Sequence, residues 1–317
     1  MKSFQRMLLW LACYVCVLLA NSAIAADAAP EKSRLPERYS VCTKCHDESE
    51  DAPILSILQT KHGVTADSRT PDCQSCHGGS EAHVRNPQGL ATRPSPDVVF
   101  KKGSYQVSDD RVRAGQCLNC HKGTNRARWD GSTHPNNQVA CNDCHKVHVP
   151  KDPVLTKKTQ NEVCFRCHKE QRAASFKIST HPIQEGKVVC ADCHNPHGSS
   201  GPSMVKKNTI TETCWQCHAE KRGPFLFEHQ PVVENCAYCH APHGSNISPL
   251  MISRSPFLCQ SCHDGSHASG SPIGSAVAGN QGGFIGNPSS NTTGRGCLDC
   301  HSQIHGSNSP NGGFLQR

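Results

Sequence analysis

Ten copies of one pentapeptide, C-x-x-C-H, account for 20 of the 22 cysteines in this 317-residue chain. Two thiols three residues apart can reach the two vinyl groups of one haem, and the adjacent histidine then faces the iron. A single motif of this kind could instead be a zinc site or a redox pair of cysteines. Ten motifs, each completed by histidine, predict ten covalently bound c-type haems.

The predicted attachment sites follow directly from these motifs. The thioether cysteines are Cys42, Cys45, Cys73, Cys76, Cys117, Cys120, Cys141, Cys144, Cys164, Cys167, Cys190, Cys193, Cys214, Cys217, Cys236, Cys239, Cys259, Cys262, Cys297 and Cys300. The histidines that end the motifs are the predicted proximal ligands of the haem irons, namely His46, His77, His121, His145, His168, His194, His218, His240, His263 and His301.

The histidines outside the motifs match the motifs in number. The chain has 20 histidines, which leaves His62, His83, His134, His148, His181, His197, His229, His243, His267 and His305 as predicted distal ligands. Any one of them could instead be a surface histidine or a partner of a haem propionate. One spare histidine per motif predicts bis-histidine, low-spin iron without an open site, and therefore an electron carrier with no catalytic residues. Met204 and Met251 are expected to be packing residues.

Motifs and spare histidines alternate along the whole chain, which divides it into two-haem modules. Five such modules begin near Cys42, Cys117, Cys164, Cys214 and Cys259. The linkers KDPVLTKKTQNEVC, GPSMVKKNTITETC and ISPLMISRSPFLC are nearly equal in length. Such self-similarity is typical of a stacked array. We predict a multihaem cytochrome fold, mostly coil with short helices that start around the motifs, packed around a linear array of ten haems.

Spacing constrains which histidine can serve which iron. Two histidines on opposite faces of one iron hold their Cα atoms roughly 12 Å apart, whereas three residues of extended chain span about 10–11 Å. His148, His197 and His243 therefore cannot bind the iron of the motif three residues earlier. The simplest wiring gives each trailing histidine to the first haem of its module, so that His197 serves the haem on Cys164 and Cys167. The intermediate histidine then serves the second haem, although wide spacings leave the first and last modules open.

The N-terminus is typical of a secretory signal peptide. Lys2 and Arg6 precede the apolar run MLLWLACYVCVLLA, and small residues follow up to Ala25. We expect residues 1–25 to be removed, which leaves 26–317 as a single elongated decahaem domain. The apolar run is too short to span a bilayer, and no later stretch is apolar enough, so we expect no transmembrane helix after cleavage.

The composition indicates that the polypeptide does not form the core alone. Hydrophobic residues are 35% of the chain and aromatic residues 5%, while glycine and proline number 25 and 21. Porphyrins would supply the missing apolar core. Without Lys2 and Arg6, 31 basic residues face 26 acidic ones, a formal charge of +5. We interpret the basic surplus as partners of haem propionates, and we expect no nucleic-acid partner.

Two segments lack haem ligands. Residues 84–116 contain the strand-like Asp97-Val98-Val99-Phe100, and we expect this segment to wrap the first module. Residues 268–294 are rich in glycine, serine and asparagine and contain no charged residue. This composition predicts a loop, either solvated or covering a haem, with contact to another protein as the alternative.

The chain after the signal peptide resembles the outer-membrane decahaem c-type cytochromes of the MtrA, MtoA and DmsE type. The resemblance lies in the ten motifs, the alternating histidines and the stretches VHVPKDPVL, HAEKRGP, HAPHGS and CHSQIHGSN. It implies an elongated haem wire inside an outer-membrane β-barrel of the MtrB or PioB kind, with its N-terminal end in the periplasm. Such a wire conducts electrons between periplasmic carriers and extracellular acceptors or donors, in metal reduction or iron oxidation. An extracellular multihaem cytochrome is a further candidate partner.

Two other classes of function compete with this interpretation. A soluble periplasmic shuttle or electron reservoir would have the same ligands without a barrel partner. A multihaem enzyme such as a nitrite reductase needs an iron with an open site, often marked by lysine in place of the motif histidine, and none of the ten motifs has that lysine.

Overall fold

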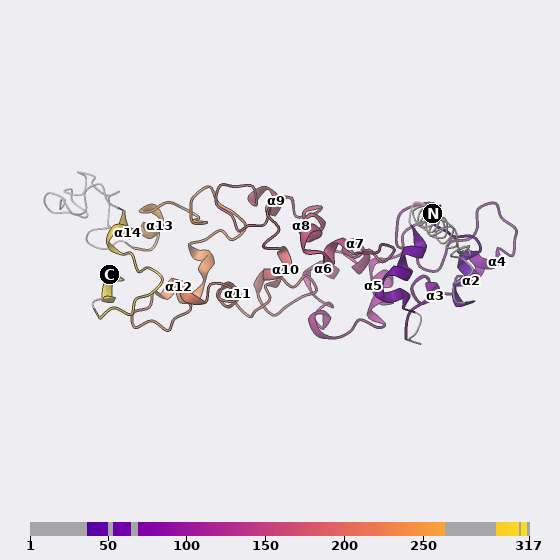
Figure 1. The fold of residues 1–317 in the computed structure, drawn as a ribbon, viewed down its shortest axis with the longest axis horizontal. Coiled ribbons are helices and arrows are strands. Elements are labelled where there is room, and N and C mark those ends of the chain that lie inside the picture. The colour runs from indigo at the N-terminus through magenta and orange to yellow at the C-terminus, as the bar shows by residue number, and fades with distance from the viewer. Residues whose placement is uncertain (1–36, 50–52, 65–68, 264–295, 311, 316–317) are drawn as a thin grey trace, which may run out of the picture. The chain divides into compact units, whose positions relative to one another are not determined.

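The computed structural model describes residues 37–49, 53–64, 69–263, 296–310 and 312–315. The predicted signal peptide at 1–25, the predicted ligand His267 and the predicted loop at 268–294 lie outside the described residues. Figure 1 shows short helices joined by long stretches of coil, as the sequence predicts. The described residues thus have the mostly coil architecture with short helices that the sequence predicts.

The chain divides into two compact units, each of which is described by itself. The first consists of Met1–Val98 with His148–Pro150, and the second of Val99–Val147 with Lys151–Arg317. The assignment of residues 26–317 to a single domain stays a prediction.

All helices are short, with nine residues the greatest length among those described. In the first unit they are α2 (Glu37–Thr43), η2 (Ile54–Gln59), η3 (Lys61–Gly63), α3 (Cys73–His77) and α4 (Glu81–Arg85). In the second unit they are α5 (Asp110–Leu118), η4 (Thr124–Arg126), α6 (Thr133–Asn136), α7 (Cys141–Cys144), η5 (Pro153–Leu155), α8 (Lys157–Phe165), α9 (Lys169–Ala174), α10 (Cys190–Cys193), η6 (Pro202–Met204), α11 (Ile210–Cys214), η7 (Ala219–Lys221), α12 (Gln230–Glu234), η8 (Cys236–Tyr238), α13 (Phe257–Gln260), α14 (Cys297–Cys300) and η10 (Gly312–Phe314).

The haem motifs occupy helix ends in a regular alternation. The first motif of a module lies at the end of a helix, as in α5, α8 and α11, whereas the second motif begins one, as in α7 and α10. In three second motifs an aspartate before the second cysteine caps the new helix. Asp143, Asp192 and Asp299 accept the backbone N–H of the residue before the first cysteine, at 2.7, 2.9 and 2.8 Å. These bonds satisfy a donor that a helix start leaves unpaired.

The strand-like segment at residues 97–100 does not form a strand, and among the described residues there are only isolated β-bridges. Val98 instead donates its N–H to the carbonyl of His77 and accepts from the ring of that histidine. The backbone of Val98 is thus paired with a haem motif, and no neighbouring strand offers a ladder to this segment in the described residues. Of the segment expected to wrap the first module, residues 84–98 belong to the first unit, whereas residues 99–116 belong to the second unit, so the prediction is wrong for its second half.

Apolar side chains are buried at scattered positions along the chain. Tyr39, Trp129 and Phe165 are the large aromatic ones that are buried in the described residues, with 3%, 6% and 4% of their surface exposed. They lie in three different modules. Within the described part, no helix has both the length and the apolar composition needed to cross a membrane.

Successive modules of the second unit interlock through the segments that carry the trailing histidines. Ser245 forms an antiparallel bridge with Ser179, and Ser307 forms one with Phe227. In the third, fourth and fifth modules a glycine follows the trailing histidine and has positive φ, +100° at Gly198, +138° at Gly244 and +125° at Gly306. A Cβ at Gly198 would lie 2.3 Å from the carbonyl oxygen of Arg128, in the preceding module. Only glycine allows both this backbone conformation and this approach.

Gly244→Ala should destabilise the junction between the third and fourth modules. The new Cβ would lie 2.0 Å from the carbonyl oxygen of Ala174, and the positive φ adds strain. We expect a loss of about 3 kcal/mol in the free energy of unfolding, measured by guanidinium titration of the holoprotein.

Gly131→Ala is the matched control. Gly131 has φ +79°, and a Cβ added there would meet no atom within 4 Å, so strain alone should cost about 1 kcal/mol. Equal losses in the two variants would contradict the role of close approach at Gly244.

Candidate haem-binding site

The two motifs of each module face one another through their first cysteines. The thiols within hydrogen-bond reach are Cys42 and Cys73, Cys117 and Cys141, Cys164 and Cys190, Cys214 and Cys236, and Cys259 and Cys297. The structure therefore brings together, module by module, the cysteines that the sequence assigns to haem attachment.

Because the two thiols of a pair share a hydrogen bond, the pKa of one thiol is raised or that of its partner is lowered. Burial, with the neighbouring Cys42 thiol, raises the pKa of Cys73 to about 12. The hydrogen bond from Cys117 lowers the pKa of Cys141 to about 7, and that between Cys214 and Cys236 lowers the pKa of Cys236 to about 6. One sulfur of a pair thus acts as donor and its partner as acceptor.

Eight of the proximal histidines each face one spare histidine. The ring centroids within these pairs are 6.0–6.3 Å apart. The pairs are His46 and His83, His77 and His148, His168 and His134, His145 and His197, His218 and His181, His194 and His243, His263 and His229, and His240 and His305.

The separation within these pairs fits one iron between two imidazoles. With an iron–nitrogen bond of about 2 Å and roughly 1.1 Å from the nitrogen to the ring centre, two axial histidines place their centroids about 6.2 Å apart. The angle between the ring planes meanwhile varies from 10° to 69°. A constant separation with a variable angle is what two ligands on one axis produce, because each can rotate about its own bond to the metal.

Hydrogen bonds orient the rings with the same nitrogen inward. Nδ1 bonds a backbone carbonyl in His77 (Val98), His83 (Pro94), His134 (Pro196), His148 (Ile54), His181 (Pro242), His194 (Ser203), His240 (Pro249) and His301 (Phe314), at 2.6–3.2 Å. A carbonyl only accepts, so Nδ1 carries the proton and Nε2 keeps its lone pair. This is the tautomer that a metal ligand requires.

Burial keeps several of these imidazoles neutral. It is the main reason that the pKa of His197 falls to about 4, with the positive charges of His145 and Arg126 adding to the effect. Burial also lowers the pKa of His77, His243 and His305. A neutral ring is available to iron without first losing a proton.

Spacing alone predicts that the distal histidines serve haems of their own module, and the observed ring pairs show that this assignment is wrong. His197 does avoid His194, as the chain length requires, but it pairs with His145 of the preceding module and not with His168. His243 pairs with His194 in the same way, and the intermediate histidines pair forward, as His181 does with His218. Of the trailing histidines, His83 keeps the expected partner, His46.

The physical reason lies in how the modules meet. The two motifs of one module already touch through their first cysteines, on the thioether side. The segment after the second motif folds back on the preceding module, where the Asn195 amide donates to the carbonyl of Asn125 at 2.9 Å. The trailing histidine is thereby carried across the module boundary.

Four predicted ligands fall outside these eight pairs. His62 lies in η3 of the first unit and His121 follows α5 in the second. His301 has its ring oriented by the carbonyl of Phe314, and its predicted partner His267 lies outside the described residues. The ligand roles of these four histidines stay predictions, as do those of the sixteen paired histidines.

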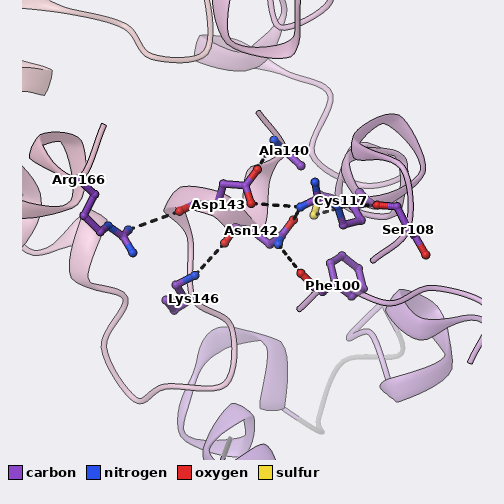
Figure 2. Close-up of polar contacts among 9 residues, drawn as sticks. Phe100, Ser108, Cys117, Ala140, Asn142, Asp143, Lys146 and Arg166 are labelled. Carbon is purple, nitrogen blue, oxygen red and sulfur yellow. Dashed lines mark hydrogen bonds and ion pairs between the residues drawn. The ribbon is translucent and has the colours of Figure 1, made fainter. Parts of the chain in front are cut away.

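A polar network fixes the second motif of the second module (Figure 2). Arg113, 9% exposed, donates to the side chains of Asn142 and Asp143 at 2.9 and 3.1 Å. Asn142 in turn donates to the carbonyl of Phe100 at 3.0 Å. A buried guanidinium with these partners holds the motif in place, so not every basic residue serves a haem propionate.

Sequence reasoning missed two side chains beside the ring pair of His145 and His197. Trp129 packs against His197, with ring centroids 6.2 Å apart. Asp152 accepts a hydrogen bond from Nδ1 of His145 at 2.6 Å. The sequence Asp152-Pro153 does signal a helix N-cap, but that signal gives no sign of the histidine.

The chain is similar in sequence to known c-type cytochromes. The multihaem cytochrome MtrA of Shewanella baltica is 43% identical over 288 residues, which cover 89% of this chain and 82% of that protein. The cytochrome c-type protein NrfB of Escherichia coli is 28% identical over 151 residues, 40% of this chain and 77% of NrfB. NrfB of Haemophilus influenzae is 24% identical over 208 residues, 61% and 69% of the two chains. The family described as a doubled CXXCH motif matches residues 134–173, 181–223 and 229–268.

Replacing His197→Ala should convert one haem to high spin while all covalent attachments remain. The affected haem should be the one on Cys141 and Cys144, because His197 pairs with His145. Electron paramagnetic resonance (EPR) of the oxidised protein measures the high-spin signal, and mass spectrometry measures the haem content.

Deleting one haem at a time identifies the haem whose iron loses its ligand in the His197→Ala variant. Adding Cys141→Ala and Cys144→Ala to His197→Ala should abolish the high-spin signal, whereas adding Cys164→Ala and Cys167→Ala should keep it. The reverse result would restore the wiring within modules.

Proposed function

We propose, from the premise that this chain belongs to the family of the multihaem cytochrome MtrA, that it is a wire of ten bis-histidine haems that conducts electrons across the outer membrane. That it is a c-type, multihaem electron-transfer protein follows from the family and its motifs. The observation that carries the finer proposal is the series of imidazole pairs at 6.0–6.3 Å, which tie each module of the second unit to the next.

Ligation by two histidines favours a carrier over an enzyme. Each haem iron supplies a one-electron exchange between its ferric and ferrous states. The paired histidines would hold the iron from both faces of the haem, and their backbone partners would keep the rings in one orientation in either state. Electron exchange then needs neither a bound substrate nor a moving segment.

The order of contacts along the chain supports conduction from module to module. Within a module the first cysteines adjoin, as Cys164 and Cys190 do. Across a boundary the second cysteine of one module lies near the first motif of the next, as Cys144 lies near Cys164 and Cys193 near Cys217. Alternation of these two contacts would place successive haems of the second unit beside one another.

We further propose that the wire lies inside an outer-membrane β-barrel. The chain is polar, with a mean hydropathy of −0.55, and such a surface cannot face hydrocarbon directly. A barrel with a wide polar lumen would shield it from lipid. Periplasmic carriers would exchange electrons at one end, and an extracellular multihaem cytochrome or an external acceptor or donor at the other.

Oxidised holoprotein should give only low-spin ferric signals in EPR, because every motif has a second histidine available. The His197→Ala variant calibrates the signal of one haem without its distal ligand. A substantial high-spin signal in intact wild-type protein would contradict full bis-histidine ligation and favour an enzyme.

The cytochrome reconstituted with its barrel in liposomes should oxidise an enclosed reduced dye when an impermeant oxidant is added outside. Transfer should require both proteins and should slow markedly when the interior haem on Cys190 and Cys193 is deleted by Cys190→Ala and Cys193→Ala. Barrel-only liposomes are the control for leakage. Transfer no faster than that control would favour the soluble shuttle.

A further inference from the structure

Among nine described histidines that hydrogen-bond through Nδ1, one has a partner unlike that of the others. Among the described residues, eight Nδ1 atoms bond backbone carbonyls. Nδ1 of His145 instead bonds a carboxylate oxygen, Oδ2 of Asp152, at 2.6 Å. Glu220 also lies 3.7 Å from Nδ1 of His218, but this distance exceeds a hydrogen bond and both side chains are more than half exposed.

The carboxylate of Asp152 is fixed in place by the backbone. Asp152 is the N-cap of η5, and its Oδ1 accepts the N–H groups of Val154 and Lys146, at 3.3 and 3.2 Å. Oδ2 is thereby directed to His145. The side chain is 12% exposed, so little water screens its charge.

The next two modules provide an internal comparison at the same place in the repeat. Nδ1 of His194 bonds the carbonyl of Ser203, and Nδ1 of His240 bonds that of Pro249, both at 2.9 Å and both nine residues further on. The loop after the motif thus supplies a neutral acceptor in those modules. In the second module a charged one takes its place.

We propose that Asp152 lowers the reduction potential of the haem on Cys141 and Cys144 below those of the haems on Cys190 and Cys193 and on Cys236 and Cys239. The inference rests on the proposed haem ligation. A carboxylate acceptor draws the Nδ1 proton and makes Nε2 a stronger donor to the iron, which stabilises the ferric state. The fixed negative charge acts in the same direction.

The role of Asp152 is that of a positioning residue for a ligand, because it acts on the iron through His145. The haem on Cys141 and Cys144 then holds an electron less readily than its neighbours. An electron moving along the chain passes this position without remaining there.

The test is Asp152→Asn in the intact holoprotein. The amide keeps an acceptor oxygen for Nδ1 but removes the charge. At a fixed potential, the ratio of ferrous to ferric form of this one haem should rise at least tenfold, which is 59 mV for a one-electron couple. A redox titration monitored by EPR measures the shift. The part of the ferric signal that comes from one haem and disappears at the lowest potential should disappear at a higher potential in the variant. Asp152→Glu, which restores the charge, should reverse most of the shift.

Asp143→Asn is the matched control. Asp143 belongs to the same motif and its carboxylate bonds Arg113 and the N–H of Ala140, but not the histidine. The Asp143→Asn substitution removes one negative charge near the same haem without changing the hydrogen-bond acceptor of His145. An unchanged titration in Asp152→Asn, or a shift equal to that of Asp143→Asn, would overturn the proposal.

A measurement on wild-type protein covers the case in which Asp152→Asn fails to mature. The near-infrared magnetic circular dichroism band of a ferric haem depends on how strongly its histidine ligands donate electron density to the iron. The contribution of one haem to this band should lie at a different wavelength from that of the other haems. A single undisplaced band would overturn the proposal. High-spin haem in the wild type would instead count against full bis-histidine ligation, and the Asp152 test would still hold because His145 is the proximal ligand.

Discussion

An imidazole pair that shares one iron tolerates little variation in its separation, because two metal–nitrogen bonds and two rigid rings set the distance. Eight histidine pairs keep their centroids within 6.0–6.3 Å, although the residues joined can be far apart in sequence, as His77 and His148 are. The surrounding backbone serves this requirement. Carbonyls orient the rings, and glycines let the segments approach closely.

The pairs also explain how a chain with few buried apolar side chains forms an ordered structure. In the second unit the histidine pairs cross the boundaries between modules, so under the proposed ligation no module there completes its own ligand set. Stability then depends on the boundaries between modules, as in other repeat proteins. The bridges of Ser179 with Ser245 and of Phe227 with Ser307 lie at these boundaries, next to the glycines with positive φ.

The same repeat allows each haem position to be tuned separately. Ser203 and Pro249 present neutral carbonyls to their histidines, while Asp152 presents a charge from an equivalent loop. A change of hydrogen-bond partner alters the donor strength of a ligand without moving the ring. Geometry common to all positions can therefore coexist with electronic properties that differ between them.

The sequence by itself determined that the chain binds c-type haems, because haem attachment requires only a short motif of neighbouring residues. The motifs, the matching number of histidines and the short helices in coil were all predictable, and the predicted family is confirmed by the 43% identical relative. Chain length also excluded His197 from the iron of its own motif. Which neighbour it would join was not predictable, since two candidates lay within reach. Only the tertiary structure decided that His197 faces His145, because the choice depends on how Gly198 and Asn195 pack against residues some 70 positions earlier. The strand expected at residues 97–100 failed for the same reason: β propensity is local, but a ladder needs a partner that the fold did not provide.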